Sequence, residues 1–183
     1  MEKRGIAGTP APQRFRQQRI LEMNPLLFLT MAFAIGVIAG LRTFTAPMVV
    51  SWAARFRWLD LDGTWAAFLG GTVAPVLLTV LAAGELISDP LPKTPSRKAP
   101  LPFAARVVSG AFSGAALATG VGQSPVQGGV LGAMGAVAGT LGGYEARMRL
   151  VKALKVPDIA IAIPEDFVAV VGGFLIVAFL LHR

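Results

Sequence analysis

The stretch GELISDPLPKTPSRKAPLP, from Gly84 to Pro102, interrupts a chain that is otherwise almost wholly apolar. It holds two acidic residues, Glu85 and Asp89, followed by several prolines and cations. Charged groups and irregular backbone are not tolerated in contact with lipid, so this stretch must lie at a membrane surface or in a protein-lined cavity. The sequence therefore predicts a small polytopic membrane protein.

The composition of the chain supports this interpretation. Of its 183 residues, 54% are hydrophobic and 15% are charged, whereas about a quarter of the residues in soluble domains are charged. The absence of cysteine excludes disulfides, thiolate metal sites and thiol nucleophiles. The net charge of +7 comes without a nucleic-acid recognition motif, and basic loops facing an anionic cytoplasmic leaflet explain it.

The apolar segments predict an all-α bundle of five transmembrane helices. Each segment reaches or approaches the ~20 residues that cross a hydrocarbon core of ~30 Å. Asn24 would cap the first helix and Pro25 would begin it. A disordered, basic cytoplasmic tail is expected over residues 1–22 and a transmembrane helical domain over residues 23–183. The predicted spans cover residues 25–54, 64–87, 103–121, 125–150 and 164–181.

The distribution of Lys and Arg predicts the orientation of these spans. If the spans alternate, the cations of the tail and of the loops after the second and fourth spans fall on one side. The other side has only Arg55, Arg57 and Arg183, so we expect a cytoplasmic N-terminus and an external C-terminus. Three tryptophans near the outer ends of the first two spans suit an interfacial aromatic belt: Trp52, Trp58 and Trp65.

Two parts of the sequence resemble each other. GVIAG at 36–40 matches GAVAG at 135–139, and WAAFLGG at 65–71 matches FVAVVGG at 167–173. This similarity predicts an inverted repeat in which spans one and two correspond to spans four and five around a central span three. Such repeats are typical of carriers, whose site lies near the bilayer midplane. The alternative is that close packing selects the same residues in unrelated glycine-rich helices.

Glycines spaced four residues apart predict close helix contacts, because packing replaces the hydrophobic drive between helices in lipid. The spacing leaves open whether these contacts form within one chain or between two. The glycines concerned are Gly36/Gly40, Gly110/Gly114, Gly128/Gly132 and Gly135/Gly139/Gly143.

Arg42 is the sharpest single feature of the sequence. A charge inside a span costs ~2.5–3.5 kcal/mol on insertion scales, so Arg42 should face the bundle interior or a wet cavity. Pro47 removes a backbone hydrogen bond about one turn later, and we expect the helix to kink or break there. Freed carbonyls and the guanidinium, with Thr43 and Thr45 nearby, could bind an anion. The alternative is a structural arginine that caps a helix end or reaches the surface.

Glu85 and Asp89 are four residues apart and share a face if the second span continues to Asp89. The helix should end there, because a residue before a proline avoids the α region. The two acids could exchange protons or bind a cation. Equally, they could pair with Lys93 or Arg97 and fix the loop.

The remaining polar residues give little indication of chemistry. Glu165 and Asp166 follow Pro164, and acids in the first turn of a helix ordinarily complement its dipole, with an ion site as the lesser alternative. His182 is the single histidine, which excludes a histidine metal site or a Ser–His pair within one chain. No catalytic motif appears, and we expect neither an enzyme nor a cofactor.

Three motifs resemble a known family. They are Gly40-Leu41-Arg42, the stretch Glu85-x3-Asp89-x-Leu-Pro-Lys-x-Pro-x-Arg97, and Pro164-Glu165-Asp166. Together they resemble the uncharacterised bacterial inner-membrane family catalogued as domain of unknown function 4126, from about Met23 to the C-terminus. The resemblance implies a small multi-span protein of the bacterial inner membrane. It brings no substrate, activity or site with it.

Two functional hypotheses follow. The first is a small transporter or channel-like protein for an unidentified, anionic solute, working as a homodimer, with anionic lipid headgroups at its basic loops. Its tentative substrate-binding residues are Arg42, Glu85, Asp89, Lys93 and Arg97, with the cations contacting the anion and the acids coupling protons. The second is a non-transporting scaffold or lipid-binding protein in which the same charges tie helix ends together. A water-filled cavity at Arg42 or Glu85 would favour the first, and a dry, paired bundle the second.

Overall fold

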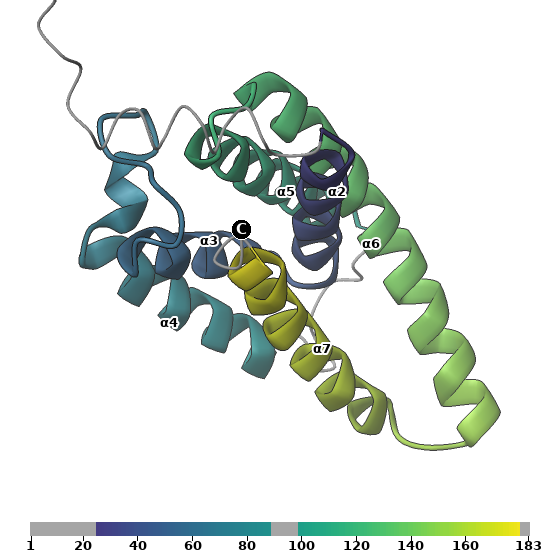
Figure 1. Cartoon of the computed structure of the whole chain (residues 1–183). Coiled ribbons are helices and arrows are strands. Elements are labelled where there is room, and N and C mark those ends of the chain that lie inside the picture. Colours follow the sequence, from purple (N-terminus) through teal and green to yellow (C-terminus); the bar gives the residue numbers. More distant parts are fainter. Residues whose placement is uncertain (1–24, 89–98, 180–183) are drawn as a thin grey trace, which may run out of the picture.

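The computed structural model describes residues 25–88 and 99–179 (Figure 1). These residues form six α-helices and one short 3₁₀ helix, with no strand among them, so the prediction of an all-α fold is confirmed. The predicted tail lies outside the described residues. The elements are α2 (Pro25–Leu41), α3 (Thr45–Arg55), η1 (Ala67–Gly70), α4 (Val73–Ser88), α5 (Pro100–Gly120), α6 (Pro125–Leu154) and α7 (Asp158–Ala178).

Glycines bring α5 and α6 into backbone contact. A Cβ atom placed on Gly132 of α6 would lie 2.1 Å from the carbonyl oxygen of Gly110 in α5. One turn away, a Cβ on Gly128 would lie 2.3 Å from the carbonyl oxygen of Gly114. The close contacts predicted from the glycine spacing therefore form, and they form within one chain. Because residue numbers rise along one helix as they fall along the other, α5 and α6 are antiparallel.

The same side of α6 also holds α2. A Cβ on Gly36 would lie 2.1 Å from the carbonyl oxygen of Gly132, and one on Gly40 would lie 2.3 Å from that of Ala136. The two numberings rise together, so α2 runs parallel to α6, as Figure 1 also shows. Five alternating spans would instead make the first and fourth antiparallel, and the five-span bundle is not confirmed.

The first predicted span, residues 25–54, is two helices rather than one. Between α2 and α3, Thr43 lies beside Ser109, near the middle of α5. After α3, Leu59 packs against Gly120 at the end of α5, where a Cβ on the glycine would lie 2.4 Å from the leucine side chain. The chain thus reverses direction between α2 and α3, at a point halfway along α5. Helix α3 then leads back to the end of α5 at Gly120.

The later helices also differ from the predicted boundaries. The second predicted span begins with turns and η1, and its helix, α4, is shorter than expected. Helix α7 begins at Asp158, so Pro164 lies inside it, and the prediction that Glu165 and Asp166 occupy a first turn is wrong. In the described part of the chain, α5 and α7 are long and apolar enough to cross a membrane, whereas α2 and α4 are apolar but shorter.

The two segments predicted to form a repeat have different local structures. Helix α6 continues without a break past the GAVAG motif, whereas α2 ends just after GVIAG. Residues 65–71 form turns and η1, but residues 167–173 lie within α7. The described structure therefore gives the inverted repeat no support.

Candidate functional site

The break between α2 and α3 exposes backbone groups that a continuous helix would satisfy. In such a helix the N–H groups of Thr43 and Phe44 would bond carbonyls one turn earlier. Here both donate to the carboxylate of Glu85 on α4, at 2.7 Å to Oε1 and 2.9 Å to Oε2. Glu85 is buried, and its negative charge lies at the positive end of the α3 dipole. A carboxylate from a distant helix therefore caps α3.

The carbonyl groups freed by the break also find side-chain partners. The carbonyl of Gly40 accepts a hydrogen bond from the Thr140 hydroxyl of α6, at 3.1 Å. Pro47, in the first turn of α3, has no N–H, so it leaves the carbonyl of Thr43 without a helical donor. The hydroxyl of Ser109 on α5 donates to that carbonyl instead. Side chains from three helices thus satisfy the broken backbone.

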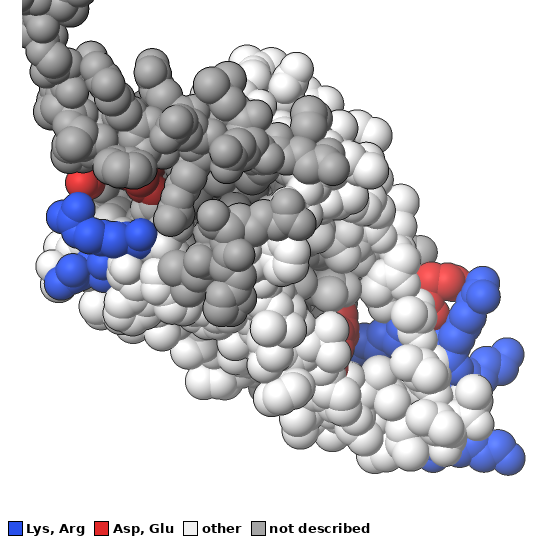
Figure 2. Space-filling view, viewed as in Figure 1, with Lys and Arg blue, Asp and Glu red and all other residues white. Residues whose placement is uncertain are grey.

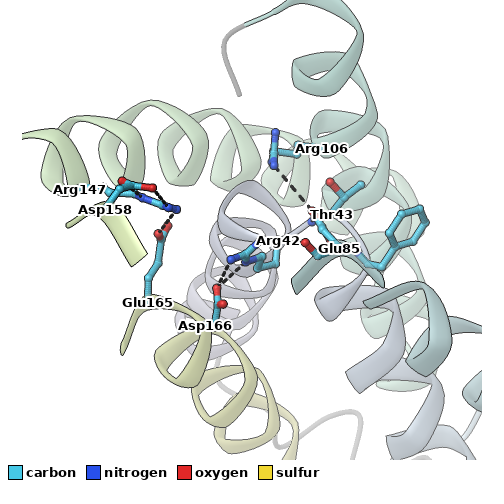
Figure 3. A network of polar contacts seen from close by, with 9 residues as sticks. Arg42, Thr43, Glu85, Arg106, Arg147, Asp158, Glu165 and Asp166 are labelled. Carbon is cyan, nitrogen blue, oxygen red and sulfur yellow. Dashed lines mark hydrogen bonds and ion pairs between the residues drawn. The ribbon is translucent and has the colours of Figure 1, made fainter. Parts of the chain in front are cut away.

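Arg42 lies at the break with no exposed surface. Its Nε donates to Oδ1 of Asp166 on α7 at 2.6 Å, and its Nη2 forms an ion pair with the same oxygen (Figure 3). Its Nη1 donates to the Glu85 carbonyl at 3.4 Å. Burying a guanidinium is costly unless an opposite charge and good hydrogen bonds compensate. Asp166 supplies that charge, so Arg42 faces the interior as predicted and ties the break to α7.

Arg106 of α5 completes the arrangement. It is 3% exposed, and its Nη2 lies 3.7 Å from Oε1 of Glu85. Two arginines and two acids from four parts of the chain therefore meet around the helix break. We call Arg42, Glu85, Arg106 and Asp166 the central charge cluster. Among the described residues its charges balance.

A second cluster lies where α6 meets α7. Arg147 donates to Asp158 Oδ1 at 2.8 Å and to Glu165 Oε2 at 3.2 Å. The neighbouring acids Glu165 and Asp166 thus serve two different arginines. The Arg147 side chain is 10% exposed, whereas that of Asp158 is 54% exposed, so this second cluster opens towards the surface. It fixes the start of α7 against α6 and holds Asp166 in reach of Arg42.

The structure brings only part of the predicted site together. Arg42 and Glu85 meet at the break, but Asp89, Lys93 and Arg97 lie outside the described residues. Among the described residues Glu85 pairs with Arg106, and the pairing with Lys93 or Arg97 proposed from the sequence involves residues outside the described ranges. Arg106 of the cluster, and Ser109 and Thr140 beside the helix break, were not predicted as site residues, and Asp166 was given an ion site only as the lesser alternative. Arg106 and Asp166 are charges within apolar segments, and this signal could have found both.

The central charge cluster lies apart from a pocket that the described residues form. This pocket has a volume of about 140 Å³, and no member of the central charge cluster lines it. It lies beyond the end of α3 and is lined by Ala54, Arg55, Arg57, Leu59, Asp60, Asp62 and Gly70. The described residues also hold no group of three acidic, histidine or cysteine side chains that could bind a metal ion. The contacts within the central charge cluster are those of ion pairing.

Comparison with known proteins gives a family match that covers the whole central charge cluster. A family model described as a domain of unknown function (DUF4126) matches residues 29–182, a range that includes every member of the central charge cluster. The family predicted from the sequence motifs is thereby confirmed. Searches of curated proteins and of solved structures gave no match.

Proposed function

The chain belongs to the DUF4126 family, and we propose that it is an integral membrane protein that moves a small anionic solute through its helix bundle. The broken helix between α2 and α3, with the central charge cluster around it, carries this proposal. In membrane carriers, discontinuous helices direct their N-termini at anionic substrates. Ionisable residues inside a membrane domain mark solute and ion pathways.

The polarity of the molecule supports insertion in a membrane. Arg42 and Arg106 are buried, whereas large apolar side chains point outward, among them Val73 of α4 (77% exposed) and Phe167 of α7 (68% exposed). Exposed apolar surface on this scale is typical of contact with another apolar phase. The length and hydropathy of α5 and α7 agree with a bilayer as that phase.

Surface charge is gathered at two ends of the molecule. Figure 2 shows Lys and Arg together with acids at opposite ends of the view, and the described surface between them is largely uncharged. Among the described cations, Arg55 ends α3 and Arg57 follows it, whereas Arg149 and Lys152 lie near the end of α6. This distribution suits two membrane–water interfaces. The proposal includes contact between anionic lipid headgroups and the α6 cations Arg149 and Lys152, with Lys155 just beyond them.

The cluster can bind an anion only if its internal ion pairs open. Arg42 is held by Asp166, and Arg106 by Glu85, so each arginine has a partner in the closed state. A solute anion would replace one of these carboxylates, and the acids would return when it leaves. In the absence of solute, the two internal ion pairs leave no buried charge uncompensated.

Reconstituted flux tests this proposal. Purified protein in proteoliposomes should accelerate the entry of at least one small anion from a panel of carboxylates, phosphate and halides, measured by stopped-flow light scattering. The double variant Arg42→Gln/Asp166→Asn keeps the cluster neutral and should reduce that flux at least ~10-fold, because the guanidinium that contacts the anion is gone. Glu145→Gln, in an exposed pair with Arg149, should leave it unchanged. Entry no faster than in empty liposomes for every anion would refute the proposal.

The second candidate is a membrane scaffold. It is favoured by the pairing of every charge in the central cluster with another of its members. It predicts that the cluster never becomes accessible to water. The expected homodimer is kept as part of the first proposal, although the glycines Gly36, Gly110 and Gly132 are used within one chain.

A further inference from the structure

We propose that the N-terminal end of α3 is an exchangeable carboxylate site, and that the Glu85 side chain occupies it as an internal substitute for a ligand. The solute class that follows, small carboxylates, rests on the proposed transport function. The binding site itself does not, because an exchangeable site can exist in a protein that transports nothing.

The geometry around Glu85 is that of carboxylate recognition. Two successive backbone N–H groups donate to the carboxylate, one to each oxygen: Thr43 N–H to Oε1 at 2.7 Å and Phe44 N–H to Oε2 at 2.9 Å. Successive N–H groups form a concave anion-binding surface, and two donors side by side match the two oxygens of a planar carboxylate. The Arg106 guanidinium, 3.7 Å from one oxygen, adds a buried positive charge.

Buried hydroxyl groups near this site point to a ligand larger than one carboxylate. Thr45 is the first residue of α3 and is 1% exposed, and its hydroxyl has no hydrogen-bond partner among the described residues. The same holds for Ser113, which is fully buried one turn after Ser109, the residue that contacts Thr43. Buried polar groups normally find partners, so these hydroxyls are available to donate to a bound carboxylate or to its substituents.

Glu85 can leave the site without breaking a helix. It belongs to α4, whereas the N–H groups that it binds belong to the α2–α3 junction, and Arg106 belongs to α5. A shift of α4 against α3 therefore vacates the site and leaves its donors in place. A small carboxylate could then restore the same hydrogen bonds and charge balance.

Chemical rescue of Glu85→Ala tests the proposal. The variant has an empty site, so about 100 mM acetate should raise its Tm by about 4 °C in detergent at constant ionic strength. Acetamide, which has nearly the same shape but no charge, should give no shift. Wild-type protein should not respond to acetate, because Glu85 fills the site, and Glu145→Ala, which removes an exposed carboxylate, should not respond either.

Each result has a defined meaning. An equal shift with chloride and acetate would overturn the carboxylate assignment in favour of a general anion site, and no shift with any anion would overturn the site altogether. If Glu85→Ala does not accumulate as folded protein, Glu85→Asp is tested instead. Its side chain is one methylene shorter, so its carboxylate is drawn back from the N–H groups of Thr43 and Phe44. Absence of an acetate shift in Glu85→Asp would then be decisive. Rescue without flux in proteoliposomes refutes transport alone, whereas flux without rescue refutes this site alone.

Discussion

Asp166→Asn is expected to lower the free energy of unfolding by about 3–5 kcal/mol, because it removes the carboxylate that pairs with the buried Arg42. Arg42 has no exposed surface, and Asp166 provides both its Nε hydrogen bond and its ion pair. Asparagine keeps the volume and one acceptor oxygen but removes the charge. The effect should appear in thermal unfolding of the purified protein as a lower Tm and in cells as a lower yield of folded protein.

The matched control removes both charges. Arg42→Met combined with Asp166→Leu should recover most of the lost stability, since a buried ion pair replaced by packed apolar groups is often neutral or stabilising. Glu145→Gln, whose exposed partner is Arg149, should change stability by less than about 1 kcal/mol. If Asp166→Asn is as stable as the wild type, Arg42 does not depend on Asp166, and the central charge cluster described above is wrong.

Gly132→Val is expected to prevent the normal packing of α5, α2 and α6, at a cost of about 3 kcal/mol or more. A Cβ at this position would lie 2.1 Å from the carbonyl oxygen of Gly110, and the carbonyl of Gly132 itself contacts Gly36. The atoms in the way belong to backbone, so no change of rotamer can make room. Thermal unfolding and protease resistance in detergent measure the loss.

Another glycine of the same helix gives the control. A Cβ on Gly142 would meet no atom within 4 Å, so Gly142→Ala should be tolerated and should stabilise α6 by about 1 kcal/mol through its helix propensity. A Gly132→Val variant as stable as Gly142→Ala would show that the helices do not approach as closely as described.

The features that could be predicted from the sequence are those that depend on the chemistry of a single segment. The free-energy cost of a charged side chain in an apolar segment predicted that Arg42 faces inward. The spacing of the glycines predicted close helix contacts. The motifs around Glu85 and Asp166 predicted the family. None of these inferences required knowledge of which helix lies beside which.

The break between α2 and α3 could not be located from sequence, because its partners are distant. Hydropathy is almost continuous over residues 25–54, and the groups that satisfy the broken backbone come from Glu85, Ser109 and Thr140. Pro47 was expected to break the helix but lies in the first turn of α3, where the missing N–H is tolerated. The break therefore comes just before the proline.

The partner of Arg42 was missed for a related reason. Pro164 was interpreted as the start of the last helix, which made Asp166 an ordinary first-turn acid. In the structure α7 begins at Asp158 and continues through Pro164, so Asp166 is in the helix interior. From there it reaches Arg42, which is 124 residues away in the sequence.

The most direct test of the account is whether water reaches the central charge cluster in a native membrane. The chain has no cysteine, so Ser109→Cys places a single thiol beside the helix break. We expect a small water-soluble thiol reagent to modify it. Asp62→Cys, in an exposed loop, is the positive control. An unmodified thiol at position 109, alongside full modification at position 62, would contradict the carrier and leave a scaffold.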